Sequence, residues 1–210
     1  MHPWLHFKTI TKHKLMVMRY CFKIGLYKQG LLHDLSKYSP AEFLVGCRYY
    51  QGNRSPNNAE REDIGVSTAW LHHKGRNRHH YEHWVDYCLD GEHVIMGAQM
   101  PRKYVAEMVM DRISASRTYL GDAYNNKQPL EYYLKSKEKL WFVHPQTKKE
   151  LEGLLRILYN CGEEKALWYI KNIYLKKGKK HSPLRKRQIA QRVMAKKRKV
   201  EQNTCCNHVL

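Results

Sequence analysis

The amino-acid sequence predicts an all-α fold, and three observations support that expectation. Apolar residues recur with the 3.6-residue period of a helix along most of the chain, and no stretch shows the alternation typical of a β-strand. Glycine, proline and short polar segments separate the periodic stretches. The chain has 210 residues, of which 42% are hydrophobic and 27% charged, so it is long enough to bury a core in one domain.

Each expected helix has a recognisable beginning or end. An apolar stripe that starts at Ile10 predicts a first helix over about residues 8–28. Ser39 as N-cap, Pro40 at the first helical position and Glu42 three residues after the cap form a capping-box signal for another helix. The remaining expected helices span about residues 59–74, 79–89, 101–119, 129–138, 148–160 and 163–176.

Positive charge is concentrated at the C-terminal end of the chain. Residues 171–210 hold 13 Lys and Arg residues against one acidic residue, whereas residues 1–170 hold 25 against 18. We therefore expect a helical domain over residues 1–175 and a basic tail over residues 176–210. Such a tail attracts polyanions, including nucleic acid, without sequence specificity. Within it, the run 196–199 resembles a nuclear-import signal.

Several classes of protein are disfavoured by what the sequence lacks. It has no run of about 18 apolar residues that could span a membrane, and its first residues form no apolar secretory signal. The six cysteines show no CxxC spacing, which indicates free thiols in a reducing compartment. We therefore expect a cytoplasmic protein with no membrane partner. The P-loop, GxSxG and GxGxxG signatures are also missing.

The adjacent residues His33 and Asp34 indicate a metal site. An imidazole and a carboxylate suit Mn, Fe, Co, Ni or Zn, and the two oxygens of the carboxylate can serve two ions. His13 lies on the apolar stripe of the first helix, where a histidine satisfied within the core is the alternative reading. Asp111 lies on an apolar helix face, where an unpaired carboxylate is costly, so it needs a metal ion or an arginine as partner.

Further histidines between these positions could complete the site. His73 shares a helix face with Trp70, and His80 is in register with Trp84, so both are expected to face the interior. His79 remains an equal candidate, because a shift of one residue in the helix start exchanges the faces of His79 and His80. Three other histidines are expected to be more exposed: His72, His83 and His93.

The order of these residues resembles the HD superfamily of metal-dependent phosphohydrolases. That superfamily is all-helical and has its ligands in the order H, HD and D, with additional histidines where two metals are bound. The segment 33–37 resembles its HDxxK variant, in which the lysine, here Lys37, faces the substrate phosphate. Closer still is an uncharacterised bacterial and phage family of unknown function. It is similar over about residues 10–160 and shares the motifs HDLSKYSPxEF, at 33–43, and HHKxxNxHHxExW, at 72–84.

The resemblance implies an HD-like helical bundle that binds one or two divalent transition-metal ions. The first ion would be held by His13, His33, Asp34 and Asp111. The second would be held by Asp34, His73 and either His79 or His80. Asp34 and Lys37 would be catalytic: a metal-activated water attacks phosphorus, and Lys37 neutralises charge on the phosphoryl oxygens. Substrate would also contact Arg76 or Asn77, and Glu82 would orient a ligand histidine.

The expected function is hydrolysis of a phosphate ester of a nucleotide or of another small phosphorylated compound. Two alternatives share the same features. Some sites of HD type hold two irons and activate O₂, so a di-iron oxygenase is one. The other is a nucleic-acid-binding protein in which the metal and histidine cluster is structural, and the basic tail favours it.

Overall fold

The computed structural model describes residues 1–89 and 94–177. The chain divides into two compact units, Met1–Lys176 and Lys177–Leu210, and we refer to the first as the domain. The tail's expected contact with polyanions, the run 196–199 and His93 lie outside the described residues. Within the described part the fold is all-α, as predicted, with one small two-stranded sheet.

The helices and strands follow one another with short connections. The first half of the domain contains α1 (Pro3–Lys23), α2 (Tyr27–Leu32), a 3₁₀ turn (Leu35–Tyr38), α3 (Pro40–Tyr49), α4 (Pro56–Ile64) and α5 (Thr68–Arg76). The second half contains a 3₁₀ turn (Tyr81–Trp84), β1 (Val85–Tyr87), β2 (Ile95–Gly97), α6 (Arg102–Leu120), a 3₁₀ turn (Gly121–Ala123), α7 (Gln128–Ser136), a 3₁₀ turn (Lys137–Lys139), α8 (Pro145–Tyr169), a π-helical segment (Ile170–Tyr174) and α9 (Leu175–Lys177).

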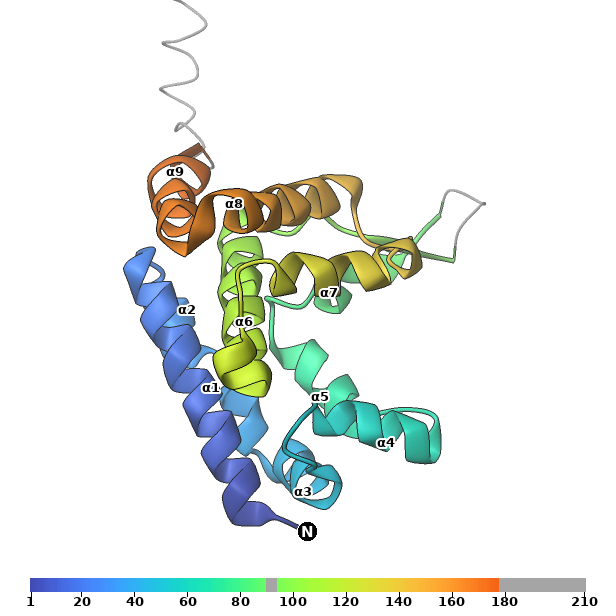
Figure 1. Cartoon of the computed structure of the whole chain (residues 1–210). Coiled ribbons are helices and arrows are strands. Elements are labelled where there is room, and N and C mark those ends of the chain that lie inside the picture. Colours follow the sequence, from blue (N-terminus) through green and yellow to red (C-terminus); the bar gives the residue numbers. More distant parts are fainter. Residues whose placement is uncertain (90–93, 178–210) are drawn as a thin grey trace, which may run out of the picture. The chain divides into compact units, whose positions relative to one another are not determined.

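Helix α6 stands at the centre of the domain (Figure 1). Helix α1 packs along one side of it, and α7 and α8 pack on the other. Val17 of α1, Val109 of α6 and Leu155 of α8 are completely buried in this core. Burial of each such side chain contributes about 1.5–3 kcal/mol, so the core holds α1 and α6 in fixed positions. These two helices carry His13 and Asp111.

The first expected helix, over residues 8–28, is in fact two helices. Gly25 has φ +81°, a left-handed conformation that commonly follows a helix C-terminus, and its N–H donates to the carbonyl of Phe22. The chain therefore turns after α1 and begins α2, which packs back against α1. This turn is what brings the His33-Asp34 pair, at the end of α2, next to α1.

The expected helix over residues 79–89 is wrong, and so is the expectation of no strand. Residues Tyr81–Trp84 form a 3₁₀ turn, and β1 then pairs antiparallel with β2, with Val85 opposite Gly97. Val and Tyr favour extended backbone, but a strand of three residues is too short to show a period. The consequence for the site is that His79 and His80 lie in an irregular turn rather than on a helix.

Two more helix boundaries differ from the expected ones. The stretch 59–74 is divided, because α4 ends before Gly65 and α5 begins after its N-cap, Ser67, whose side chain accepts from Trp70 N–H. The expected break between 160 and 163 is present as a kink within α8, at Gly162. No helix among residues 1–89 and 94–177 is long and apolar enough to cross a membrane.

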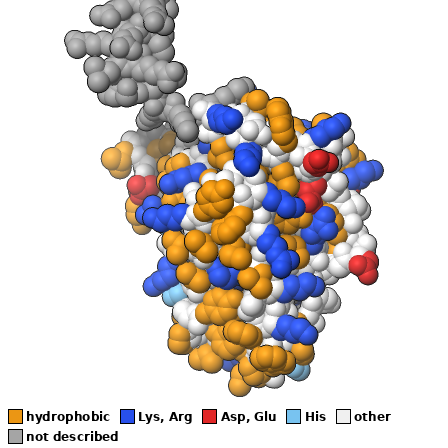
Figure 2. Space-filling model, turned by 90° about the vertical axis from the view of Figure 1, so that its left-hand side faces the viewer, with side chains coloured by type: hydrophobic (Ala, Val, Ile, Leu, Met, Phe, Trp, Pro, Cys, Tyr) orange, Lys and Arg blue, Asp and Glu red, His pale blue; other side chains and the backbone are white. Residues whose placement is uncertain are grey.

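One face of the domain is rich in basic side chains. Figure 2, which views the side of the domain on which α1 lies, shows Lys and Arg side chains among apolar ones and few acidic ones. Helices α1 and α2 together contain six Lys and Arg residues and no acidic residue. Part of the positive charge of the domain therefore lies on this face.

Candidate metal centre

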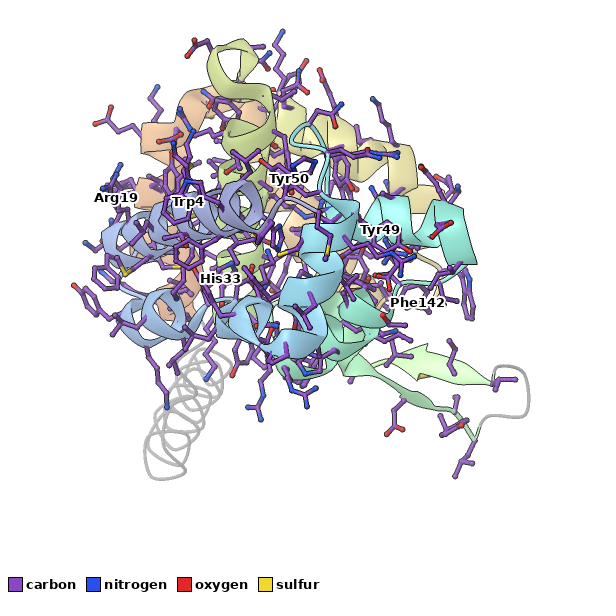
Figure 3. The ribbon with its side chains drawn as sticks, turned by 90° about the horizontal axis from the view of Figure 1, so that it is seen from below. Trp4, Arg19, His33, Tyr49, Tyr50 and Phe142 are labelled. Atoms are coloured by element: carbon purple, nitrogen blue, oxygen red, sulfur yellow. The ribbon has the colours of Figure 1, made fainter. Side chains whose placement is uncertain are left out.

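The His33-Asp34 pair lies at the junction between α2 and the following 3₁₀ turn. Asp34 has φ +54°, the one positive φ among the described residues other than glycine. Aspartate tolerates this left-handed conformation better than most residues, but it is uncommon, and such strain is often found at functional sites. Both side chains are turned inward: His33 is 1% exposed and Asp34 2%. Figure 3 shows His33 among the ribbons in the interior.

Four side chains from three segments form what we call the first cluster: His13, His33, Asp34 and Asp111. His13 Nε2 lies 3.0 Å from Asp111 Oδ1 and 3.7 Å from Asp34 Oδ2. His33 Nε2 lies 3.3 Å from Asp34 Oδ2 and 3.8 Å from Asp111 Oδ1. Donor atoms about 2.1 Å from one ion lie roughly 3.0–3.5 Å apart, so the first cluster has about the size of a coordination shell.

The other oxygen of Asp34 belongs to what we call the second cluster: Asp34, His73, His79 and His80. Asp34 Oδ1 lies 3.3 Å from His73 Nε2 and 3.4 Å from His79 Nε2. His73 Nε2 lies 3.0 Å from His80 Nε2. The structure therefore brings both His79 and His80 into the site, since neither is constrained to one face of a helix. Asp34 contributes one oxygen to each cluster.

Several buried atoms in the two clusters make no hydrogen bond of good geometry within the part of the chain that the structure describes. They are His13 Nε2, His33 Nε2, Asp34 Oδ1 and His79 Nε2. Leaving a buried polar atom unsatisfied costs about 1–3 kcal/mol, and most such atoms in proteins are paired. Nitrogen and oxygen atoms that converge in this way, once any proton on Nε2 has left, form the environment that a divalent cation requires, so the donor set fits a metal.

Two glutamates contact the Nδ1 atoms of the cluster histidines. Neither glutamate was predicted from the sequence to have this role. Glu107 Oε1 lies 3.0 Å from His33 Nδ1 and 3.3 Å from His79 Nδ1. Glu42 Oε2 lies 2.8 Å from His73 Nδ1. A carboxylate at Nδ1 favours the tautomer with the proton on Nδ1, which leaves the Nε2 lone pair for a metal.

Glu42 also corrects the expected capping box. Ser39 is the N-cap of α3 and Pro40 its first residue, as predicted, but no described side chain makes a capping hydrogen bond to the helix. The Glu42 carboxylate instead contacts His73 and, at 2.7 Å, His72 Nδ1. Both partners lie on α5, which packs against α3, so Glu42 links these two helices instead of capping its own.

Of the three residues expected to bind substrate or to orient a histidine, only Glu82 lines the cavity described below. Asn77 is buried, and its Nδ2 donates to Ser36 Oγ at 2.7 Å and to the His73 carbonyl at 2.9 Å, so it ties α5 to the 3₁₀ turn. Arg76 is exposed and does not line the cavity described below. Glu82 lines that cavity but makes no hydrogen bond to a histidine among the described residues. The glutamates that do contact cluster histidines are Glu42 and Glu107.

Lys37 lies one 3₁₀ turn from Asp34, and the two side chains form an ion pair with Lys37 Nζ 2.6 Å from Asp34 Oδ2. Burial alone would lower the pKa of Lys37, but the charges of Asp34 and Asp111 raise it above its ordinary value. Lys37 is therefore protonated at neutral pH. Its side chain is 29% exposed and lines the cavity, so it can meet a ligand as well as Asp34.

Burial and neighbouring charges set the pKa values of the cluster carboxylates and of His80. Burial would raise the pKa of Asp34, but His33, Lys37 and His73 hold it well below its usual range. Burial would likewise raise the pKa of Asp111, but His13 and His33 hold it well below its usual range. Burial, together with neighbouring His79 and His73, holds the pKa of His80 well below its usual value, so its imidazole is neutral and able to bind a metal.

A cavity of about 580 Å³ adjoins both clusters. His13 and Asp111 of the first cluster and His73 and His80 of the second line one part of it. Basic and aromatic side chains line much of the rest: Lys37, Arg54, Arg61, Arg112, Tyr50, Trp70, Tyr81, Tyr119 and Tyr132. A ligand in this cavity would touch both clusters and a positively charged wall.

The fold and the site together define an all-α protein with a candidate metal centre of two clusters that share one aspartate. Residues 2–157 match the family of unknown function DUF5662, and the chain belongs to that family. The matched span contains every residue of both clusters, together with Lys37, Glu42 and Glu107. No curated protein and no solved structure matches the chain.

Proposed function

We propose that the protein is a metal-dependent phosphohydrolase, related to the HD superfamily, that hydrolyses a phosphate ester of a nucleotide or another small phosphorylated compound. The observation that carries the proposal is the sharing of Asp34. One of its oxygens faces His13 and His33 of the first cluster, and the other faces His73 and His79 of the second. Two ions held on either side of one carboxylate would suit phosphoryl transfer.

The donor sets name the residues that would hold each ion. The first would use His13, His33, Asp34 and Asp111; the second would use Asp34, His73, His79 and His80. Imidazole and carboxylate donors suit Mn, Fe, Co, Ni or Zn. When bound, such ions act as Lewis acids and lower the pKa of water toward neutrality.

The remaining side chains would bind the ester and balance its charge. Lys37 is protonated and lines the cavity, so it would pair with the phosphoryl oxygens as negative charge develops on them. Arg112 also lines the cavity, and its buried Nε has no hydrogen-bond partner in the described part of the domain. In the reaction the oxygen of water bonds to phosphorus as the ester P–O bond breaks. The proton that the water loses ends on the departing alcohol.

The test is a screen of phosphate esters with Mn, Co, Ni, Mg and Zn, using protein purified without a histidine tag. Phosphate release by the parent is expected to disappear in Asp34→Asn and His33→Ala, because each removes a donor from the centre of the site. His83→Ala is the matched control, since His83 lies outside both clusters and the cavity. Equal release by the parent and Asp34→Asn would reject the proposal.

A di-iron oxygenase is the second candidate. Three imidazoles and one carboxylate in the second cluster form a donor set that also suits iron. Bound iron with an optical charge-transfer band, together with no phosphate release from any ester, would favour this function over hydrolysis. Salt-dependent nucleic-acid binding that survives loss of the cluster residues would instead favour a binding protein with a structural centre.

A further inference from the structure

We infer that the cavity contains a second subsite, in which His6 recognises an uncharged hydrogen-bonding group of a nucleoside-sized leaving group. The inference rests on the proposed function only for the phosphate end of that ligand. The subsite itself is built from side chains that belong to neither metal cluster.

The position of His6 sets its distance from the clusters. It precedes His13 by seven residues on α1, which is two helical turns, so both side chains lie on the same face. With a rise of 1.5 Å per residue, the two positions are about 10 Å apart along the helix axis. Both residues line the 580 Å³ cavity. A ligand that contacts the first cluster at one end could therefore reach His6 at the other.

His6 is a buried polar side chain with no hydrogen-bond partner among residues 1–89 and 94–177. It is 6% exposed, and its Nδ1 is buried without a hydrogen bond. Its neighbours are aromatic rings: those of Phe43 and Tyr50 lie 5.5 and 5.9 Å from the imidazole, centre to centre. Tyr50 lies beside α1 (Figure 3), and its hydroxyl is engaged with Thr9 Oγ1 at 2.8 Å. The rings hold the imidazole in place but leave its hydrogen-bonding capacity unused.

Gly46 of α3 makes the space that the imidazole occupies. A Cβ at position 46 would overlap His6 Nε2, so any larger residue would displace the ring. The fold therefore makes room for a polar ring at a buried position. An apolar side chain there would avoid the cost of removing a polar group from water. A ligand that pairs with the imidazole accounts for this arrangement, since an unpaired buried polar group is otherwise destabilising.

The charge of His6 indicates what kind of group it would bind. Burial, together with the positive charge of Lys37, lowers the pKa of His6 to about 4. A neutral imidazole offers one donor and one acceptor, which match a hydroxyl, an amide or the edge of a base rather than a second phosphate. The cavity volume lies within the range of about 300–1,000 Å³ typical of pockets for larger small molecules, well beyond the needs of phosphate alone.

The experiment compares substrates of different length on the manganese-loaded protein. The probes are the four common nucleoside 5′-monophosphates, ribose 5-phosphate and glycerol 3-phosphate. We measure the ratio of kcat/KM for each nucleotide to kcat/KM for glycerol 3-phosphate. His6→Phe keeps a planar ring and removes both nitrogens, so the ratio for the preferred nucleotide is expected to fall about tenfold, the worth of one hydrogen bond of this kind. His83→Ala, outside the cavity, should leave the ratio unchanged.

A second variant disturbs the subsite without changing His6. Gly46→Ala displaces the imidazole and should lower the same ratio, while bound manganese stays as in the parent. An unchanged ratio in both variants would overturn the inference, as would an equal loss of activity toward the long and the short esters.

The outcomes also separate this inference from the proposed function. If no ester is hydrolysed, hydrolysis is rejected, and calorimetric binding of the nucleoside monophosphates to the manganese-loaded protein becomes the readout. Binding that weakens about tenfold in His6→Phe then supports the subsite. Equal binding by the parent and His6→Phe, or no binding by either, rejects it.

Discussion

Glu107 Oε1 accepts a hydrogen bond from His33 Nδ1 at 3.0 Å and lies 3.3 Å from His79 Nδ1. A single carboxylate oxygen therefore supports one histidine of each cluster. Both contacts are made on the ring nitrogen that points away from Asp34, and they leave each Nε2 directed toward it. Glu107 is thus placed to fix the relative orientation of the two clusters without itself being needed as a ligand.

Removing the charge of Glu107 should weaken metal binding at both clusters. We expect Glu107→Gln to lower metal affinity about 10–100-fold, the usual effect of losing a carboxylate that orients a ligand histidine. Calorimetric titration with manganese measures the affinity. Glu131→Gln, at an exposed position of α7, is the control. Affinity that stays equal to that of the parent in Glu107→Gln would show that the carboxylate does not orient the ligands.

The sharing of Asp34 predicts different metal stoichiometries in two variants. Asp111 belongs to the first cluster only, so Asp111→Asn should reduce bound metal by one ion. Asp34→Asn should reduce it by both, since the amide keeps only one oxygen and loses the negative charge that the two clusters share. Asparagine tolerates the left-handed backbone at position 34 nearly as well as aspartate, so the fold should persist. Elemental analysis gives the number of ions, and circular dichroism checks the fold. Equal loss in the two variants would contradict a shared carboxylate.

Some of the cluster residues could be predicted from the sequence because they lie on apolar helix faces. His13 and Asp111 are polar residues within stripes of buried side chains, which is a detectable conflict between residue type and position. Glu107 carries the same signal, since it lies one helical turn before Asp111 on a face that is also buried. Glu42 could not be predicted as part of the site, because its position in a capping-box pattern already explained an acidic residue there. Its partners on α5 are not visible in the sequence.

The parts that the sequence could not predict depend on single backbone conformations or on very short elements. The division of the first helix follows from a positive φ at Gly25, and a helical period continues past that position in the sequence. The hairpin that follows Trp84 has strands of three residues each. The choice between His79 and His80 depended on an expected helix, in which only one of them could face the site. The chain forms a turn there instead, and both side chains enter the second cluster.

Metal binding should release protons and strengthen with pH. Burial alone would lower the pKa of His33, but Asp34, Glu107 and Asp111 raise it to about 10. Below that pH the metal-free imidazole holds a proton on each nitrogen, and the one on Nε2 must leave before a metal binds. The apparent affinity should therefore rise by about tenfold per pH unit for each proton released, and level off above pH 10. Titration calorimetry in buffers of different ionisation enthalpy counts the protons. Affinity independent of pH between 6 and 8 would contradict the prediction.

Stability should depend on a carboxylate that lies away from the metal clusters. Glu60 of α4 is 2% exposed and accepts hydrogen bonds from Ser67 Oγ at 2.5 Å, Thr68 N–H at 3.0 Å and Thr68 Oγ1 at 2.6 Å. These bonds hold the start of α5, the helix that carries His73. We expect Glu60→Ala to lower the free energy of unfolding at pH 7 by about 1–3 kcal/mol, because the buried Ser67 hydroxyl and the partly buried Thr68 donors lose their acceptor. Urea denaturation measures the loss, and Glu62→Ala, at an exposed position, is the control.

The same carboxylate predicts how the loss varies with pH. Burial would raise the pKa of Glu60, but hydrogen bonds from Ser67 and Thr68 lower it below the ordinary value of 4.5. The unfolded chain therefore takes up a proton at this position before the folded protein does. The stabilisation is complete above about pH 4.5 and is lost as the pH falls through the lower folded-state pKa. The difference between the parent and Glu60→Ala should thus be constant from pH 7 to 5 and shrink below 4.5. A difference that grows on acidification would contradict this assignment.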